Sequence, residues 1–251
     1  MKNKFFKIAL ILILPVFIYA SEEMKTPLET LYNWIPLMLT GFLVNVKMSL
    51  VAMFLGLVAG SILGVSQFSD SYIVKKISWL TTQFFRNSPW LVILFVIMLL
   101  VPLKISIFGL PVELSDWLKA AIGFSLPIMA NVSEIVRGAI NSVPVGQSEA
   151  AKSLGYSKNQ TMYQIILPQC VKRMIPPLMN WFAILIMATP LASIIGVEEA
   201  VNLTQQALNA ENSRVELLMP FYGFLLIVFF LFCYPISLFT KYLEKKFNVI
   251  L

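Results

Sequence analysis

Long apolar runs alternate with shorter polar stretches along this chain of 251 residues. After a separate N-terminal run, five apolar segments cover 34–66, 89–109, 117–140, 170–197 and 217–243. Each is long enough to cross a bilayer, which takes roughly 20 residues of α-helix. The polar stretches between them are 67–88, 110–116, 141–169 and 198–216. The pattern predicts an all-α, polytopic membrane protein with five core transmembrane helices and no internal repeat.

The N-terminal segment 1–21 has a different layout. Three lysines precede a short apolar core, and a polar run follows Ala20. This three-part arrangement is typical of a secretory signal. Ile18 lies three residues before the expected cleavage point, where a small residue is preferred, so an uncleaved additional transmembrane helix is the alternative.

Basic residues gather on one side of the predicted spans. If the N-terminus, the stretches 67–88 and 141–173 and the C-terminal tail lie inside, that side holds fourteen basic and four acidic residues. The other side holds four basic and nine acidic residues, and Lys47 lies within a span. Because short cytoplasmic loops of membrane proteins are enriched in Lys and Arg, the charges predict this orientation, with a cytoplasmic C-terminus.

The composition excludes several classes of protein. Hydrophobic residues make up 58% of the chain and charged residues 13%, about half of the roughly 25% charged residues of soluble domains. A cytosolic enzyme, a disordered chain and a disulfide scaffold are therefore excluded. The net charge of +6 is spread too thinly to indicate nucleic-acid binding.

The residues that carry common chemistry are missing. There is no histidine, the two cysteines are isolated, and no glycine is followed by lysine, so the phosphate loop of ATP-binding proteins is absent. A membrane enzyme would need a nucleophile–base pair or a metal-ligand cluster. An ion-coupled carrier would need acids central in its spans. We predict a protein that is not an enzyme, and any ATP that it uses must be bound by another chain.

The polar segment 141–169 contains the signals of two short helices. Ser148 is suited to cap the first one, and Glu149 in its first turn would complement the helix dipole. Gly155 can adopt the left-handed conformation that ends a helix. A small, partly apolar face is formed by Ala150, Ala151 and Leu154.

The second helix is predicted to begin at Tyr156, and Pro168 follows where the next span starts. Its apolar positions at helical spacing are Met162, Ile165 and Ile166. These features fit a capped connector that rests on the membrane surface. A docking surface for a partner is the less favoured alternative on these features alone, because capping chemistry identifies no partner.

The same segment resembles the EAA loop of bacterial ABC importer permeases. The matching residues are Glu149, Ala150, Ala151, Gly155, Ile165, Leu167 and Pro168. The flanking segments are similar to those of permeases for polar amino acids, the histidine/glutamine type: Gly41–Lys47, Phe85–Pro89, Glu134–Ile140, Val143–Gln147 and Ala192–Glu199. The resemblance covers 36–245 and implies a type-1 ABC transporter transmembrane domain.

This resemblance implies a mechanism with separate parts. Two permeases, either two copies of this chain or this chain and a sister permease, would form the pathway in the inner membrane. The EAA loop would act as a coupling helix in a groove on ATPase subunits, which hold ATP and Mg, while this chain binds no cofactor. A periplasmic binding protein would deliver the polar amino acid, and the sequence leaves open which one.

Two departures from the family pattern occur. The fourth core span has Met187-Ala188-Thr189-Pro190-Leu191 where many relatives have Lys-Asp-Thr-Ser-Leu, and Asn87 replaces a glycine. The loss of a charged pair at that depth indicates a changed pathway or partner contact. Thr189 is a candidate pathway-lining residue.

Other residues have a packing interpretation and a functional one. Gly56, Gly60 and Gly64 share one helix face, where small residues allow close helix packing. Glu134 can pair with Arg137 on the same face or line the inner pathway.

Two features toward the predicted outer side of the membrane also have a structural and a functional interpretation. Lys47 is expected to have a polar packing role rather than to contact substrate. The acidic stretch 198–216 is either a solvated loop or a docking site for the binding protein.

Overall fold

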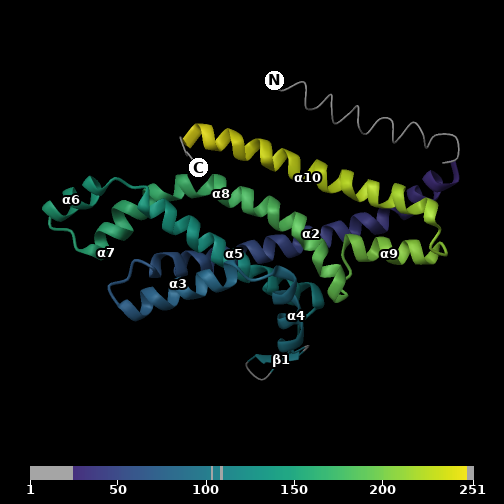
Figure 1. Cartoon of the computed structure of the whole chain (residues 1–251), viewed down its shortest axis with the longest axis horizontal. Helices are drawn as coiled ribbons and strands as arrows, with labels where there is room; N and C mark the ends of the chain where they lie inside the picture. Colours follow the sequence, from purple (N-terminus) through teal and green to yellow (C-terminus); the bar gives the residue numbers. More distant parts are fainter. Residues whose placement is uncertain (1–24, 103, 108–109, 248–251) are drawn as a thin grey trace.

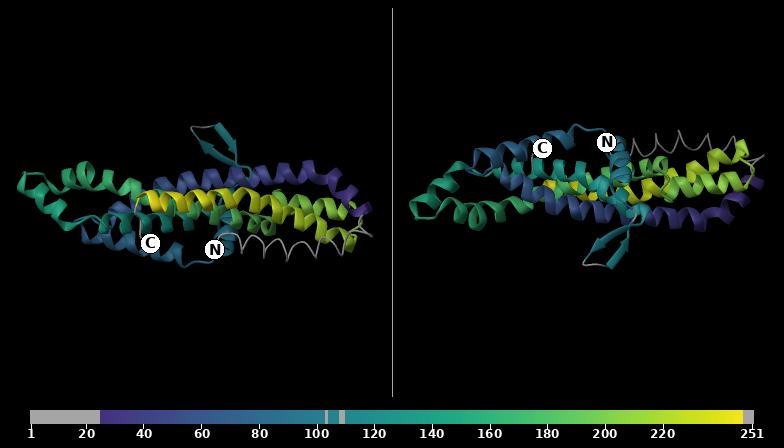
Figure 2. Two further views of the ribbon diagram at one scale, coloured as in Figure 1. Left: turned by 90° about the horizontal axis from the view of Figure 1, so that it is seen from above. Right: turned by 90° about the horizontal axis from the view of Figure 1, so that it is seen from below.

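The computed structural model describes residues 25–102, 104–107 and 110–247, so the predicted signal or extra helix at 1–21 lies outside it. The described chain is an elongated bundle of helices with a small β-hairpin at its side (Figures 1 and 2). Its elements are α2 (Lys25–Ser66), α3 (Tyr72–Arg86), α4 (Trp90–Leu100), β1 (Lys104–Ile107), β2 (Leu110–Glu113), α5 (Asp116–Asn141), α6 (Val145–Ser153), α7 (Lys158–Gln160), the π-helical turn η1 (Thr161–Ile166), α8 (Leu167–Ala188), the 3-10 turn η2 (Thr189–Ile195), α9 (Ala200–Ala210), the 3-10 turn η3 (Val215–Leu217) and α10 (Leu218–Phe247).

Three stretches of described helix are long and apolar enough to cross a membrane: Pro27–Ser66, Lys158–Ile195 and Val215–Phe247. They contain the predicted spans 34–66 and 217–243 and all but the last two residues of the predicted span 170–197. The predicted span 117–140 is the helix α5, whose 26 residues extend about 39 Å. It is long enough to cross, but Lys119, Glu134 and Arg137 make it less apolar than the other three.

The predicted span 89–109 is not a continuous helix. The helix α4 has 11 residues, about 16 Å, roughly half the thickness of a bilayer core. It ends because Val101, which is extended at ψ 114, precedes Pro102, and a proline disfavours helical backbone in the residue before it. The antiparallel strands β1 and β2 follow. Together α3 and α4 form a pair bent by 106°, the fourth candidate span.

Two of the predicted polar connectors contain helices. The stretch 67–88 holds α3, and 198–216 holds α9, whose N-cap Glu199 accepts hydrogen bonds from the N–H groups of Val201 and Asn202. The sequence pattern did not reveal these two helices, because the positions that they bury include polar or small residues. In α3 these are Ser78 and Thr82, and in α9 they include Ala200 and Thr204.

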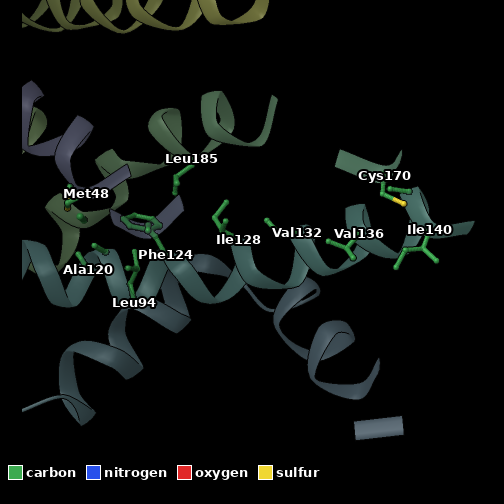
Figure 3. Packing of buried hydrophobic residues seen from close by; sticks show 14 of the residues in the cluster. Met48, Leu94, Ala120, Phe124, Ile128, Val132, Val136, Ile140, Cys170 and Leu185 are labelled. Atoms are coloured by element: carbon green, nitrogen blue, oxygen red, sulfur yellow. The ribbon is translucent and has the colours of Figure 1, made fainter. Parts of the chain in front are cut away.

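The core is organised around α5. Every fourth residue of one side is a buried hydrophobic one (Figure 3): Phe124, Ile128, Val132, Val136 and Ile140. Helix α2 lies parallel to this row, with Gly56, Gly60 and Gly64 opposite Ile128, Val132 and Val136 in turn. The parallel direction agrees with the prediction that both helices cross the membrane the same way. A second cluster joins the N-terminal half of α2 to α9 and α10.

Candidate functional site

Helices α6 and α7 form one end of the elongated chain, and α9 lies near the other end (Figure 1). Helix α6 begins at Val145, directly after Pro144, whose C=O accepts a hydrogen bond from the Gln147 N–H at 3.0 Å. The prediction that Ser148 caps this helix is therefore wrong, since Ser148 lies inside it. A proline lacks the N–H that an early helix position would leave unpaired, so the Val-Pro pair was the better signal for the start.

Gly155 ends the first helix as predicted, in the left-handed conformation with φ +81. Its N–H donates to the Lys152 C=O at 2.9 Å, and the Tyr156 N–H donates to the Ala151 C=O at 3.1 Å. This pair of bonds is the Schellman motif, which satisfies carbonyls at a helix end. The left-handed residue is thus what turns the chain from α6 towards α7.

The predicted coupling residues divide into two sets. Glu149, Ala150 and Pro168 are exposed, and a side chain at Gly155 would meet open space. Ala151 is only 2% exposed, because α6 packs against η1, and Ile165 and Leu167 are partly buried. Two further apolar residues of α6 and its end project outward: Val145 is 72% and Leu154 77% exposed. The outer surface therefore combines one carboxylate, small residues and two aliphatic side chains.

The second helix starts two residues later than predicted, at Lys158, and a capping box holds it. The Ser157 hydroxyl accepts from the Gln160 N–H, and the Gln160 side chain accepts from the Ser157 N–H. The spacing Ser-x-x-Gln could have identified it. Lys158 also forms an ion pair with Asp70, which ties this loop to the connection between α2 and α3.

Glu134 lies in a cluster of charges between α3 and α5. Its carboxylate is 2.5 Å from Arg137 and 3.4 Å from Arg86, and its side chain is 14% exposed against 41% and 46% for the two arginines. The predicted pairing with Arg137 is confirmed. Arg86 was not foreseen, because it comes from another helix. The role of Glu134 in lining an inner pathway stays a prediction.

Thr189 is fully buried in the chain. Its hydroxyl donates to the Ile186 C=O at 2.7 Å and accepts from the Asn45 amide at 2.9 Å. Both sides of the hydroxyl are therefore occupied inside the bundle, and the role of Thr189 in lining a pathway stays a prediction.

The same Asn45 amide also donates to Glu199 at 2.7 Å, and the Asn45 carbonyl oxygen accepts from the Ala200 N–H at 3.0 Å. Asn45 and Glu199 are both fully buried. This network, which joins α2, η2 and α9, was not identified from the sequence. An asparagine inside an apolar span was the available signal, because polar groups there need partners.

Lys47 lies with its ammonium group 3.7 Å from the centre of the Trp117 ring, a geometry that supports a cation–π interaction. Among the described residues, no group of three or more acidic or cysteine side chains is arranged to hold a metal ion. Cys170 and Cys233 are both free and buried.

These features define a polytopic helical membrane protein with a capped two-helix loop at one end of its bundle. Residues 56–249 match the family model for the inner membrane component of binding-protein-dependent transport systems, and the chain belongs to this family. It is thus a multi-pass membrane permease of the ABC transporter class.

Two relatives agree with this assignment. The chain is 36% identical over 215 residues to the probable amino-acid ABC transporter permease protein YckA of Bacillus subtilis (strain 168), covering 84% of this chain and 89% of the relative. It is 34% identical over 191 residues to the inner membrane amino-acid ABC transporter permease protein YhdY of Escherichia coli (strain K12), covering 75% of this chain and 50% of that relative.

A solved structure shares the fold. The crystal structure of an amino acid ABC transporter with histidines superposes with a TM-score of 0.72 at 23% identity, covering 86% of this chain and 96% of that chain. The fold predicted from the sequence, a transmembrane domain of an ABC importer, is confirmed.

Proposed function

We propose that this chain is the permease subunit of an ATP-driven importer of a polar amino acid. Family membership supports the permease role, and YckA and YhdY are both amino-acid ABC transporter permeases. The motifs flanking the EAA-like loop support a polar amino acid as the substrate.

The observation that carries the proposal is the exposed helix α6 at the end of the bundle. It presents Glu149, Ala150 and Gly155 together with the aliphatic Val145 and Leu154 on one projecting element. Short apolar and small side chains on a helix suit recognition by a groove. We assign α6 as the coupling helix that docks on a separate ATPase, which binds ATP and Mg. The chain itself binds no cofactor.

The remaining parts of the proposal follow from the orientation. With the basic end of the bundle and the C-terminus in the cytoplasm, α6 faces the ATPase and the end with α9 faces the periplasm. A binding protein would deliver the amino acid there. A second copy of this chain or a sister permease would complete the pathway.

The ATPase contact is tested by replacing Gly155 with valine. A non-glycine residue held in the left-handed conformation costs about 1–2 kcal/mol, so the equilibrium constant for forming the intact turn falls about 5- to 30-fold. Since a Cβ at Gly155 meets no atom within 4 Å, this cost comes from the backbone alone. We expect Gly155→Val to lose ATPase co-purification and amino acid uptake, while the chain still inserts in the membrane.

Two matched variants serve as controls. Gly223→Val adds the same side chain in α10, outside the proposed docking helix, at a site where a Cβ also meets no atom within 4 Å and φ is not positive. Gly155→Asn introduces asparagine, a residue that tolerates φ > 0. Both should retain the ATPase. Uptake measured with competing amino acids, in cells that contain the ATPase and the binding protein, identifies the substrate. Full uptake by Gly155→Val would rule out α6 as the coupling helix.

A further inference from the structure

A cavity of about 490 Å³ lies beside α3 at the end of α5 that leads to α6. Three of its lining residues are basic, Lys75, Lys76 and Arg137, and two are aromatic residues of α3, Tyr72 and Trp79. No feature of the proposed coupling mechanism uses this cavity. Its lining combines positive charge with amphipathic rings, which is the chemistry of a membrane–water boundary.

Helix α3 is amphipathic in the opposite sense to a helix of a soluble protein. Its buried residues are the polar Ser78 and Thr82. Its large apolar side chains point away from the bundle, with Ile73 68%, Ile77 58% and Phe84 67% exposed. Apolar side chains stay exposed at low cost only where the surroundings are apolar, as in the acyl region of a bilayer.

The polar side of α3 has its partners within the chain. The Thr82 hydroxyl lies 3.0 Å from the Ser133 hydroxyl, and Gln67 donates to both of these groups, at 3.2 and 2.8 Å. These bonds hold α3 against α5, and the basic residues of α3 line the cavity. The orientation of α3 is therefore set by polar contacts rather than by apolar burial.

Positive charge is in excess around the cavity. Glu134, the nearby carboxylate, is shared by Arg137 and Arg86. Asp70, the other acid of this region, is paired with Lys158. Among the ion pairs of the described residues, none involves Lys75 or Lys76. The ammonium of Lys76 lies 5.5 Å from the centre of the Tyr72 ring.

We propose that this cavity binds the phosphate headgroup of an anionic phospholipid, with its acyl chains along the exposed apolar side of α3. The Lys75 and Lys76 ammonium groups and the Arg137 guanidinium supply charge-assisted hydrogen bonds to the phosphate. Trp79 and Tyr72 lie at the level of the headgroup and glycerol. Basic pockets between helices near the cytoplasmic surface suit such headgroups.

The test is a lipid titration of the full-length purified chain in neutral detergent, with native mass spectrometry counting bound phosphatidylglycerol. For wild type we expect a bound lipid that phosphatidylcholine does not replace. In Lys75→Gln/Lys76→Gln the affinity should fall about 30-fold, the effect of two basic residues near an anionic lipid surface. Lys75→Arg/Lys76→Arg should retain the lipid.

A second lysine pair provides the matched control. Lys245 and Lys246 lie in the last turn of α10, and the ammonium of Lys246 lies 6.0 Å from the centre of the Tyr242 ring. The local chemistry is therefore similar, but neither lysine lines the cavity. Lys245→Gln/Lys246→Gln removes the same charge and should change the affinity less than about threefold. Because uptake and ATPase binding are not measured, failure of this proposal is distinct from failure of the coupling proposal.

Three outcomes would overturn the proposal. Equal losses in the two glutamine pairs would mean that only general surface charge attracts the lipid. Displacement of phosphatidylglycerol by an equal concentration of inorganic phosphate would mean that the site takes a soluble phosphate. A change from dimer to monomer in Lys75→Gln/Lys76→Gln, with lipid binding unaltered, would assign this side of α3 to contact with a second permease.

Discussion

The close contact of α2 with α5 makes Gly60→Ala a sharp test of the packing. A Cβ built at Gly60 would lie 2.5 Å from the Met129 carbonyl oxygen and 2.6 Å from the Val132 Cβ. Non-bonded carbon atoms are at their optimum at about 3.5–4 Å, so the two helices would have to separate by about 1 Å. Because one of the opposing atoms belongs to the backbone, no side-chain rotation can relieve the contact.

The expected cost follows from two opposing effects. Adding a methyl group to a packed interior costs about 1–3 kcal/mol, whereas alanine is favoured over glycine in a helix by about 1 kcal/mol. We therefore expect Gly60→Ala to lower the free energy of unfolding by up to about 2 kcal/mol. In Gly223→Ala, the matched control in α10, the new Cβ meets no atom within 4 Å. Only the helix preference then acts, so this variant should be as stable as wild type or more stable.

Double variants separate backbone contacts from side-chain contacts. At Gly56 the closest atom to a new Cβ is the Ile128 Cγ2 at 2.5 Å, and Ile128→Ala removes it, while the weaker contacts with the Ile128 Cβ at 2.9 Å and the Met129 N at 3.1 Å remain. The pair Gly56→Ala/Ile128→Ala should therefore be more stable than the sum of its single effects by about 1 kcal/mol. Val132→Ala should give Gly60→Ala no such relief, because the Met129 oxygen and the Val132 Cβ remain.

The assay is thermal unfolding of each purified variant in detergent, with the fraction inserted in membranes measured in parallel. If Gly60→Ala proved as stable as Gly223→Ala, the contact would not limit the approach of the helices. The reasoning would also be refuted if Val132→Ala restored Gly60→Ala, because that would place the strain in a movable side chain.

Two polar clusters give further predictions, measured in the same unfolding assay. Asn45→Ala removes the buried partner of the Glu199 Oε2 atom and of the Ala200 N–H, while Glu199 Oε1 keeps its two backbone donors. It should therefore destabilise the chain by about 1–3 kcal/mol. Unchanged stability would contradict the buried network. Glu134→Ala should cost less than about 1 kcal/mol, since the arginines that it pairs with are partly exposed and ion pairs of exposed groups are weak. A loss above 3 kcal/mol would contradict this.

Features that depend on neighbours in the sequence were predictable. The left-handed Gly155 and the pairing of Glu134 with Arg137 each involve residues within one or two helical turns. Glycines spaced four apart identified the packing side of α2. The parallel course of α2 and α5 follows from two spans that cross in the same direction. In each case local geometry or the bilayer leaves few alternatives.

Other features needed the fold. The hydrogen bond that the Thr189 hydroxyl accepts from Asn45 was not foreseen, because Asn45 lies 144 residues away in the sequence. The segment of helix α3 was predicted to be a polar connector, because the residues that it buries are polar and do not form the apolar pattern expected of a packed helix. The predicted span 89–109 is interrupted after α4 because of Pro102. The apolar residues around this proline masked the interruption in the sequence pattern.

The sequence alone determined that the chain is a multi-span helical permease with an EAA-like loop. The multi-span architecture could be predicted because a bilayer demands apolar helices of a set length and a charge bias that a single chain records directly. The permease class was implied by the resemblance of the loop and its flanking motifs to a known family. Only the tertiary structure decided which side chains of that loop stay exposed, which polar residues meet inside the bundle and how closely α2 approaches α5. Those outcomes depend on atoms brought together from distant parts of the chain, where a difference of about 1 Å changes which side chains fit.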